Sequence, residues 1–239
     1  MNALKRNIPN AITCMNVTAG TIAILFALGG DRYPALHAGG MTPWAWACIM
    51  IGVAAVADFL DGFAARALRA YSDLGKELDS LCDLVSFGVA PAAILFSVLN
   101  DLSPASWTAW AVPVIPVAGA LRLARFNIDT RQATSFIGLP IPANALFWIG
   151  YTALCLEGAA TLAEWWIAVP AILLESWLML SPLPLFSLKF KTWTWKGNEA
   201  RWLLIATAIA AVALTGAGGL LWLIVCYLVI SLFPFARKS

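Results

Sequence analysis

Eight long apolar segments divide this sequence and limit it to one broad class of fold. They cover residues 8–29, 42–70, 75–100, 107–129, 140–156, 162–180, 200–217 and 219–236. A helix rises about 1.5 Å per residue, so roughly 20 apolar residues can cross the hydrocarbon core of a bilayer. Only 12% of the residues are charged, whereas a soluble domain usually carries about 25%. We therefore expect an all-α polytopic membrane protein with about eight transmembrane helices, forming one membrane-embedded catalytic domain over residues 1–239.

The basic residues predict how this chain is oriented in the membrane. With eight spans both termini lie on the same side, and all of the 15 lysines and arginines except Arg32 fall on that side. Loops rich in lysine and arginine stay in the cytoplasm. We therefore expect a multi-pass protein of the cell (inner) membrane, with its N-terminus and C-terminus in the cytoplasm.

Four aspartates interrupt the second and third apolar segments near their predicted cytoplasmic ends. Asp58 and Asp61 are three residues apart and Asp79 and Asp83 are four apart, so each pair lies on one face of its helix. A short turn around residues 70–73 makes the two helices antiparallel neighbours. Like charges about 4 Å apart repel by about 4 kcal/mol at an effective dielectric constant of 20. The pattern therefore predicts that bound cations offset the converging carboxylates.

Polar groups surround the mouth of this acidic site. They are Arg66, Arg69, Ser72 and Lys76. Basic groups beside carboxylates favour a metal-bound anion such as a diphosphate, because Mg²⁺ prefers oxygen ligands and arginine binds phosphate oxygens. Gly62 and Gly75 indicate close approach of a ligand or of another helix. In the first segment, Asn10, Thr13 and Asn16 form a polar stripe that suits either ligand contact or interhelical hydrogen bonds.

The spacing of these residues resembles a known family signature. Asp58-x2-Asp61-Gly62-x2-Ala65-Arg66-x8-Gly75-x3-Asp79-x3-Asp83 is similar to the signature of the CDP-alcohol phosphatidyltransferase family at all eight of its fixed positions. This family transfers a phosphatidyl-type group from a CDP-linked lipid to an alcohol and releases CMP. The resemblance implies two Mg²⁺ or Mn²⁺ ions held by Asp58, Asp61, Asp79 and Asp83, with Asp83 also the base for the acceptor hydroxyl. It further implies contacts to the CDP-lipid from Asn10, Thr13, Asp61, Gly62, Ala65, Arg66, Ser72 and Gly75.

Later segments resemble one branch of that family. Residues 86–91, 121–127 and 136–144 are similar to the phosphatidylserine synthase branch. The likeness covers about residues 5–191, the six-span core. The added spans at about 200–236 match this branch only in being further apolar spans. It implies transfer of the phosphatidyl group from CDP-diacylglycerol to L-serine by direct in-line attack, giving phosphatidylserine and CMP. The implied partners are these two substrates and the lipid bilayer, with a homodimer left open and no nucleic acid expected.

Two arginines are candidates for recognising serine. Arg122 and Arg125 are three residues apart on one helical face, and a guanidinium can hold a carboxylate through two parallel hydrogen bonds. The alternative is that both only anchor the helix at the cytoplasmic surface. Glu175, an acid within the sixth segment, has no assigned role.

Alternative functions remain open from the sequence alone. Within the same family, the acceptor could be glycerol phosphate or inositol phosphate, or the donor an archaeal ether lipid. From another class, an ion transporter also carries intramembrane acids, but it favours broken helices near the midplane and repeated halves. The sequence shows neither feature.

Overall fold

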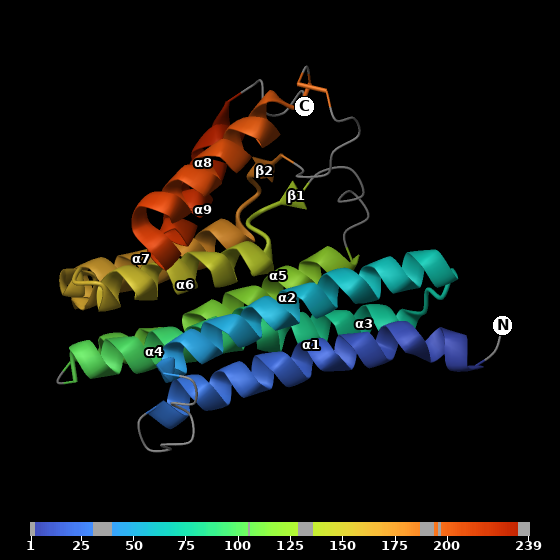
Figure 1. Ribbon diagram of the computed structural model, residues 1–239, viewed down its shortest axis with the longest axis horizontal. Helices are drawn as coiled ribbons and strands as arrows, with labels where there is room; N and C mark the ends of the chain where they lie inside the picture. Colours follow the sequence, from blue (N-terminus) through green and yellow to red (C-terminus); the bar gives the residue numbers. More distant parts are fainter. Residues whose placement is uncertain are drawn as a thin grey trace.

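The computed structural model describes residues 3–30, 40–104, 106–128, 136–186, 194–195 and 197–233, and most of this part of the chain is helical (Figure 1). The α-helices are α1 (Ala3–Gly29), α2 (Pro43–Leu68), α3 (Asp73–Asp83), α4 (Ala90–Leu102), α5 (Val114–Ile128), α6 (Ile141–Leu156), α7 (Trp165–Leu180), α8 (Glu199–Thr215) and α9 (Gly219–Leu232). The shorter elements are the π-helix η3 (Leu84–Val89), the 3₁₀ helices η4 (Thr108–Ala111), η6 (Ala160–Ala163) and η7 (Gly216–Gly218), and the strands β1 (Phe136–Ile137) and β2 (Pro184–Leu185).

Each of the eight predicted apolar segments coincides with helical structure, which confirms the all-α polytopic class. Among the described residues, five helical stretches are long and apolar enough to cross a membrane: Asn7–Gly29, Pro43–Leu68, Asp73–Leu102, Thr108–Ile128 and Glu199–Leu232. The helices α6 and α7 are apolar but shorter. The predicted break between the last two spans falls at η7, where Gly216 adopts a φ of 53°, and α8 packs against α9 beyond it.

The helices form a bundle around two buried apolar clusters. One cluster joins side chains of α1, α2, α4 and α6, and the other joins side chains of α4 to α7 with α8 and α9. Figure 1 shows α1 to α7 lying roughly along one direction, while α8 and α9 lean away from them. Contact between α6 and α9 is close at Gly150, where an added Cβ would lie 2.1 Å from the Leu221 nitrogen. The C-terminal helices are therefore anchored on α6.

Capping residues define the turn between the two acidic helices. The helix α2 ends at Leu68, and the capping residue Arg69 adopts the left-handed conformation with a φ of 51°. Ser72 then caps α3, its Oγ accepting a hydrogen bond from the Gly75 nitrogen at 3.0 Å. Such a cap satisfies a backbone donor at the start of a helix. The predicted turn around residues 70–73 is confirmed, and it places α2 beside α3.

The third predicted span contains a π-helix that its sequence did not indicate. It begins at Leu84, directly after Asp83, and α4 continues the same stretch from Ala90. Asn144 of α6 donates to the Phe87 oxygen of this π-helix at 2.9 Å. Insertions of this kind change which side of the helix later residues face, and they occur often at functional sites.

A two-stranded pair lies near the ends of α5 and α7. The strands β1 and β2 are antiparallel, with Phe136 opposite Leu185 and Ile137 opposite Pro184. Gly138 follows with a φ of 73°, and its nitrogen donates to the Leu183 oxygen at 2.9 Å. The sequence did not predict this pair, because two residues are too few to show the alternation that marks a strand.

Candidate active site

Three aspartates of α2 and α3 converge beside α1, the helix that packs against both. Asp58, Asp61 and Asp79 each place a carboxylate oxygen within 4.8 Å of the others. Within the described residues, the buried Oδ2 of Asp61 and Oδ1 of Asp79 have no hydrogen-bond partner. A buried carboxylate oxygen without a partner is costly, and neighbouring carboxylates repel one another. A divalent cation satisfies both demands with the oxygen ligands it prefers, so these residues fit a metal ion.

Asp83 lies next to this group of three but is not part of it. It stands one turn beyond Asp79, at the junction of α3 with the π-helix, and its carboxylate lies close to that of Asp58. Asn16 of α1 donates to Asp83 Oδ1 at 3.1 Å. The four predicted carboxylates are thus gathered in one region, with three converging on one point and the fourth beside them. That Asp83 completes a two-ion set stays a prediction.

A cavity of about 210 Å³ opens beside the carboxylates. Its lining contains all of the predicted donor-binding residues except Arg66: Asn10, Thr13, Asp61, Gly62, Ala65, Ser72 and Gly75. Arg66 is exposed at the rim, where its Nη1 lies 3.5 Å from the position that a Cβ on Gly62 would take. The structure therefore brings the predicted donor residues of α1, α2 and α3 together around one hollow.

Local packing explains two of these residues. At Gly75 an added Cβ would lie 3.0 Å from both Asn10 Oδ1 and Ser72 Oγ, so glycine permits α1 to approach α3. The Thr13 hydroxyl donates to the Pro9 oxygen at 3.0 Å and neighbours the Asp61 carboxylate. The polar stripe of the first helix thus serves both helix packing and the acidic site.

The two arginines predicted to bind serine have different surroundings. Arg122 is buried, and its guanidinium lies within electrostatic range of Asp83 and Tyr227. In the part of the chain that the structure describes, Arg122 Nε has no hydrogen-bond partner. Arg125 is exposed and donates through Nη1 to the Leu180 oxygen at 3.2 Å. Of the two arginines, Arg122 is therefore the one that is buried near Asp83.

The site region also contains residues that the sequence analysis did not assign. Asn16 belongs to the polar stripe with Asn10 and Thr13, and that periodicity could have identified it. Tyr227 of α9 donates to the Phe186 oxygen at 3.0 Å and lies near Arg122, but nothing in its apolar surroundings in sequence distinguishes it. Glu175 is buried with an unpartnered Oε1 among the described residues, and the structure assigns it no role.

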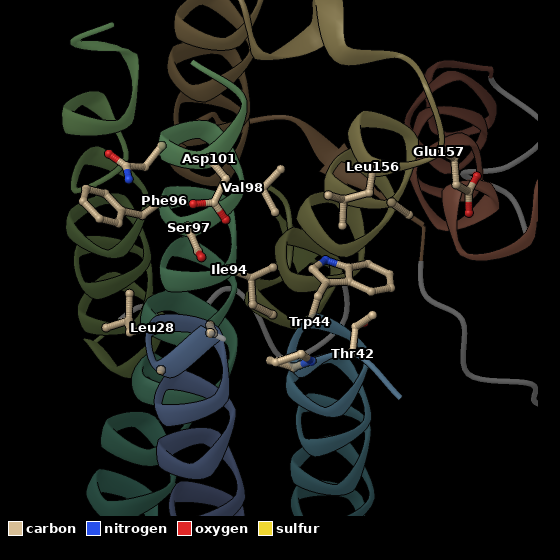
Figure 2. A pocket seen from close by; sticks show the side chains of 16 residues that line it. Leu28, Thr42, Trp44, Ile94, Phe96, Ser97, Val98, Asp101, Leu156 and Glu157 are labelled. Carbon is tan, nitrogen blue, oxygen red and sulfur yellow. The ribbon is translucent and has the colours of Figure 1, made fainter. Parts of the chain in front are cut away.

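A larger cavity of about 930 Å³ lies at the other end of the bundle (Figure 2). The ends of α1 and α6, the start of α2, and α4 form its wall, which includes Trp44, Asp101 and Glu157. Asp101 is 18 residues beyond Asp83 along one continuous helical stretch, which corresponds to about 27 Å. That distance separates this cavity from the converging carboxylates, so its size does not make it the active site.

Sequence comparisons with known proteins identify the family of this chain. The family model described as CDP-alcohol phosphatidyltransferase matches residues 6–179. A protein from Mycobacterium bovis named CDP-diacylglycerol–serine O-phosphatidyltransferase is 34% identical over 245 aligned positions, covering 97% of this chain and 78% of the relative.

Two further relatives cover less of their own length. The protein of the same name from Mycobacterium leprae is 36% identical over 186 residues, covering 74% of this chain but only 57% of the relative. An archaetidylserine synthase from Methanothermobacter thermautotrophicus is 36% identical over 141 residues, covering 58% of this chain and 54% of the relative. The family match spans the first helix, both acidic helices and Arg122. The resemblance is thus confirmed, and the chain belongs to the CDP-alcohol phosphatidyltransferase family.

Proposed function

We propose that this protein transfers the phosphatidyl group of CDP-diacylglycerol to the hydroxyl of L-serine, forming phosphatidylserine and releasing CMP. The observation that carries this proposal is the juxtaposition of three converging carboxylates, the cavity beside them, and a buried Arg122 within electrostatic range of Asp83. The names of the mycobacterial relatives support the same reaction. No other part of the described structure combines a metal-compatible acidic site with a hollow for a diphosphate.

The donor side is formed by α1, α2 and α3. Asp58, Asp61 and Asp79 would hold the divalent ions, Mg²⁺ or Mn²⁺. When bound there, such ions stabilise negative charge on the diphosphate and on departing CMP. The cavity lined by Asn10 and Ser72 receives the cytidine diphosphate group, and Arg66 at its rim reaches the phosphate oxygens. The two chains of the lipid remain in the bilayer around the helices.

The acceptor side lies between α3 and α5. Arg122 binds the serine carboxylate, which orients the serine hydroxyl toward the phosphorus on the lipid side of the diphosphate. The hydroxyl oxygen forms a bond to that phosphorus while the bond to the CMP oxygen breaks, in line with the attack. Asp83 accepts the hydroxyl proton. No covalent enzyme intermediate is required, because direct attack of the serine hydroxyl transfers the phosphatidyl group and releases CMP in a single displacement.

This reaction agrees with the charge distribution along the chain. CDP-lipids and serine are cytoplasmic substrates in this scheme, and the lysine and arginine residues favour a cytoplasmic face for the acidic site of a multi-pass inner-membrane protein. Residues 5–191 would form the catalytic core, with α8 and α9 packed on it. A homodimer is compatible with this arrangement.

The name of one relative points to a second class of lipid donor. The archaeal relative is named as an archaetidylserine synthase, and its name describes an ether-lipid product with the same head group. Because the lipid chains lie outside the acidic site, the same residues could serve an ether-linked donor. The acceptor in both cases is serine.

The experiment that tests this function uses the purified full chain with Mn²⁺ and either the diacyl or the ether-linked CDP-lipid. The acceptors are L-serine, glycerol 3-phosphate and inositol phosphate, and the measured product is CMP together with the lipid formed. We expect CMP release that depends on serine and on the metal. Release with glycerol 3-phosphate or inositol phosphate in place of serine would overturn the proposed acceptor.

A further inference from the structure

The amide of Asn16 is buried against the carboxylate that the mechanism uses as a base. Asn16 has no exposed surface, although it carries a polar side chain within a membrane-spanning helix. Its Nδ2 donates to Asp83 Oδ1 at 3.1 Å, which joins α1 to the end of α3. Such a contact between residues 67 positions apart in sequence is a tertiary feature rather than a local cap.

The direction of this hydrogen bond follows from the chemistry of the two groups. A carboxylate can only accept, so the amide must present its nitrogen rather than its oxygen. The bond occupies Oδ1 of Asp83 and leaves Oδ2 without a contact to Asn16. An amide is also uncharged, so it can hold Asp83 without adding a positive charge that would repel divalent cations at the neighbouring carboxylates.

A second contact holds Asn16 in place from the opposite direction. Ser86 of the π-helix donates from Oγ to the Asn16 backbone oxygen at 3.0 Å, and both residues are fully buried. The approach depends on Gly20, because an added Cβ there would lie 2.2 Å from Ser86 Oγ. Asp83 and the π-helix that follows it are therefore both tied to α1 at Asn16.

We infer that Asn16 is a positioning residue for Asp83: its amide holds one carboxylate oxygen so that the other points at the serine hydroxyl. This inference rests on the proposed function, because it assumes that Asp83 accepts the proton. Asn16 does not belong to the three converging carboxylates or to the lining of the donor cavity. It should therefore affect the rate of the chemical step rather than binding of the donor or the metal.

The test compares Asn16→Leu, which keeps a similar branched shape without hydrogen bonds, with Asn16→Ser, which retains a shorter donor. For Asn16→Leu we expect kcat to fall about 10- to 100-fold, the loss that corresponds to one hydrogen bond to a charged group. The KM for CDP-diacylglycerol and the Mn²⁺ affinity measured by electron paramagnetic resonance should stay within about threefold of the wild-type values. Asn16→Ser should recover part of the lost kcat.

The matched control is Ser86→Ala, which removes the other contact of Asn16 without touching Asp83. It should lower the melting temperature while leaving kcat largely unchanged.

The inference is overturned if Asn16→Leu keeps full kcat, if its Mn²⁺ affinity falls as much as kcat, or if Ser86→Ala lowers kcat equally. If Asn16→Leu does not fold, the kcat and Mn²⁺ affinity of Asn16→Ser are compared with those of Ser86→Ala, and the same results overturn the inference. Wild-type protein that releases no CMP with serine would instead refute the proposed function.

Discussion

At the scale of single residues, the decisive feature is the unequal surroundings of chemically similar side chains. Asp58, Asp61 and Asp79 converge, whereas Asp83 stands beside them with one oxygen held by Asn16. Carboxylates that converge on one point fit a divalent cation, whereas the amide of Asn16 holds Asp83 in its ionised form. Identical residues at helical spacing can thus take different roles.

The metal prediction is tested by Asp79→Asn. Removing one charge from the three converging carboxylates should weaken Mn²⁺ binding and reduce CMP release by at least about 100-fold, because charged ligands dominate affinity for hard cations. Mn²⁺ binding is measured by electron paramagnetic resonance alongside the rate. Asp73→Asn, an exposed residue at the start of α3, is the control and should keep both properties. Full activity of Asp79→Asn at saturating Mn²⁺ would disprove the metal site.

The acceptor prediction is tested by Arg122→Lys. Lysine keeps the charge but loses the planar pair of donors, so kcat/KM for serine should fall about 10- to 100-fold. Arg125→Lys is the matched control and should change little, because Arg125 bonds a backbone carbonyl. Serinol, which lacks the carboxylate, should be a poor acceptor for the wild type and be little affected by Arg122→Lys. Equal use of serinol and serine by the wild type would exclude carboxylate recognition.

At the scale of elements, close helix contacts determine how the C-terminal helices attach to the core. The helix α9 lies against α6 at Gly150, and it brings Tyr227 to the neighbourhood of Arg122. The last two helices lie beyond residues 6–179, to which the family match is confined. Their packing nevertheless places one of their side chains beside the proposed acceptor site, so they are part of the same structure as the catalytic residues.

The α6–α9 contact is tested by Gly150→Ala. The new Cβ would overlap the Leu221 backbone, so helix separation should destabilise the protein by about 1–3 kcal/mol. The measurement is the melting temperature of the purified protein in detergent, with serine KM as a second readout. Gly52→Ala in α2 is the control, since an added Cβ there meets no atom within 4 Å. A melting temperature of Gly150→Ala equal to that of this control would contradict the described contact.

At the scale of the whole molecule, one end of the bundle carries the acidic site and the other carries the larger cavity. The stretch Asp73–Leu102 connects both ends as 30 residues of continuous helical structure, which is about 45 Å long. This length exceeds the hydrocarbon core of a bilayer, so the two ends lie at opposite membrane surfaces. The distribution of basic residues predicts that the acidic end faces the cytoplasm.

This orientation is tested by cysteine labelling in a variant whose five native cysteines are replaced. Asn100→Cys and Asp73→Cys lie at exposed positions near opposite ends of the long helical stretch. In intact bacterial spheroplasts, a membrane-impermeant maleimide should label Asn100→Cys, while Asp73→Cys should react only after lysis. The reverse pattern would place the acidic site outside the cell, away from the proposed substrates.

The sequence by itself determined the membrane class and the two acidic helices joined by a short turn, while the resemblance to the family supplied the residues expected around the smaller cavity. These features depend on apolar segment length and on i, i+3 and i+4 spacing, which are local properties of a helix. The tertiary structure decided which carboxylates converge, that Arg122 rather than Arg125 is buried within electrostatic range of Asp83, and that Asn16 bonds to Asp83. Those outcomes depend on contacts between helices far apart in sequence and on the π-helix after Asp83. Helical periodicity carries no information about such contacts, because it specifies the face of a residue but not what packs against it.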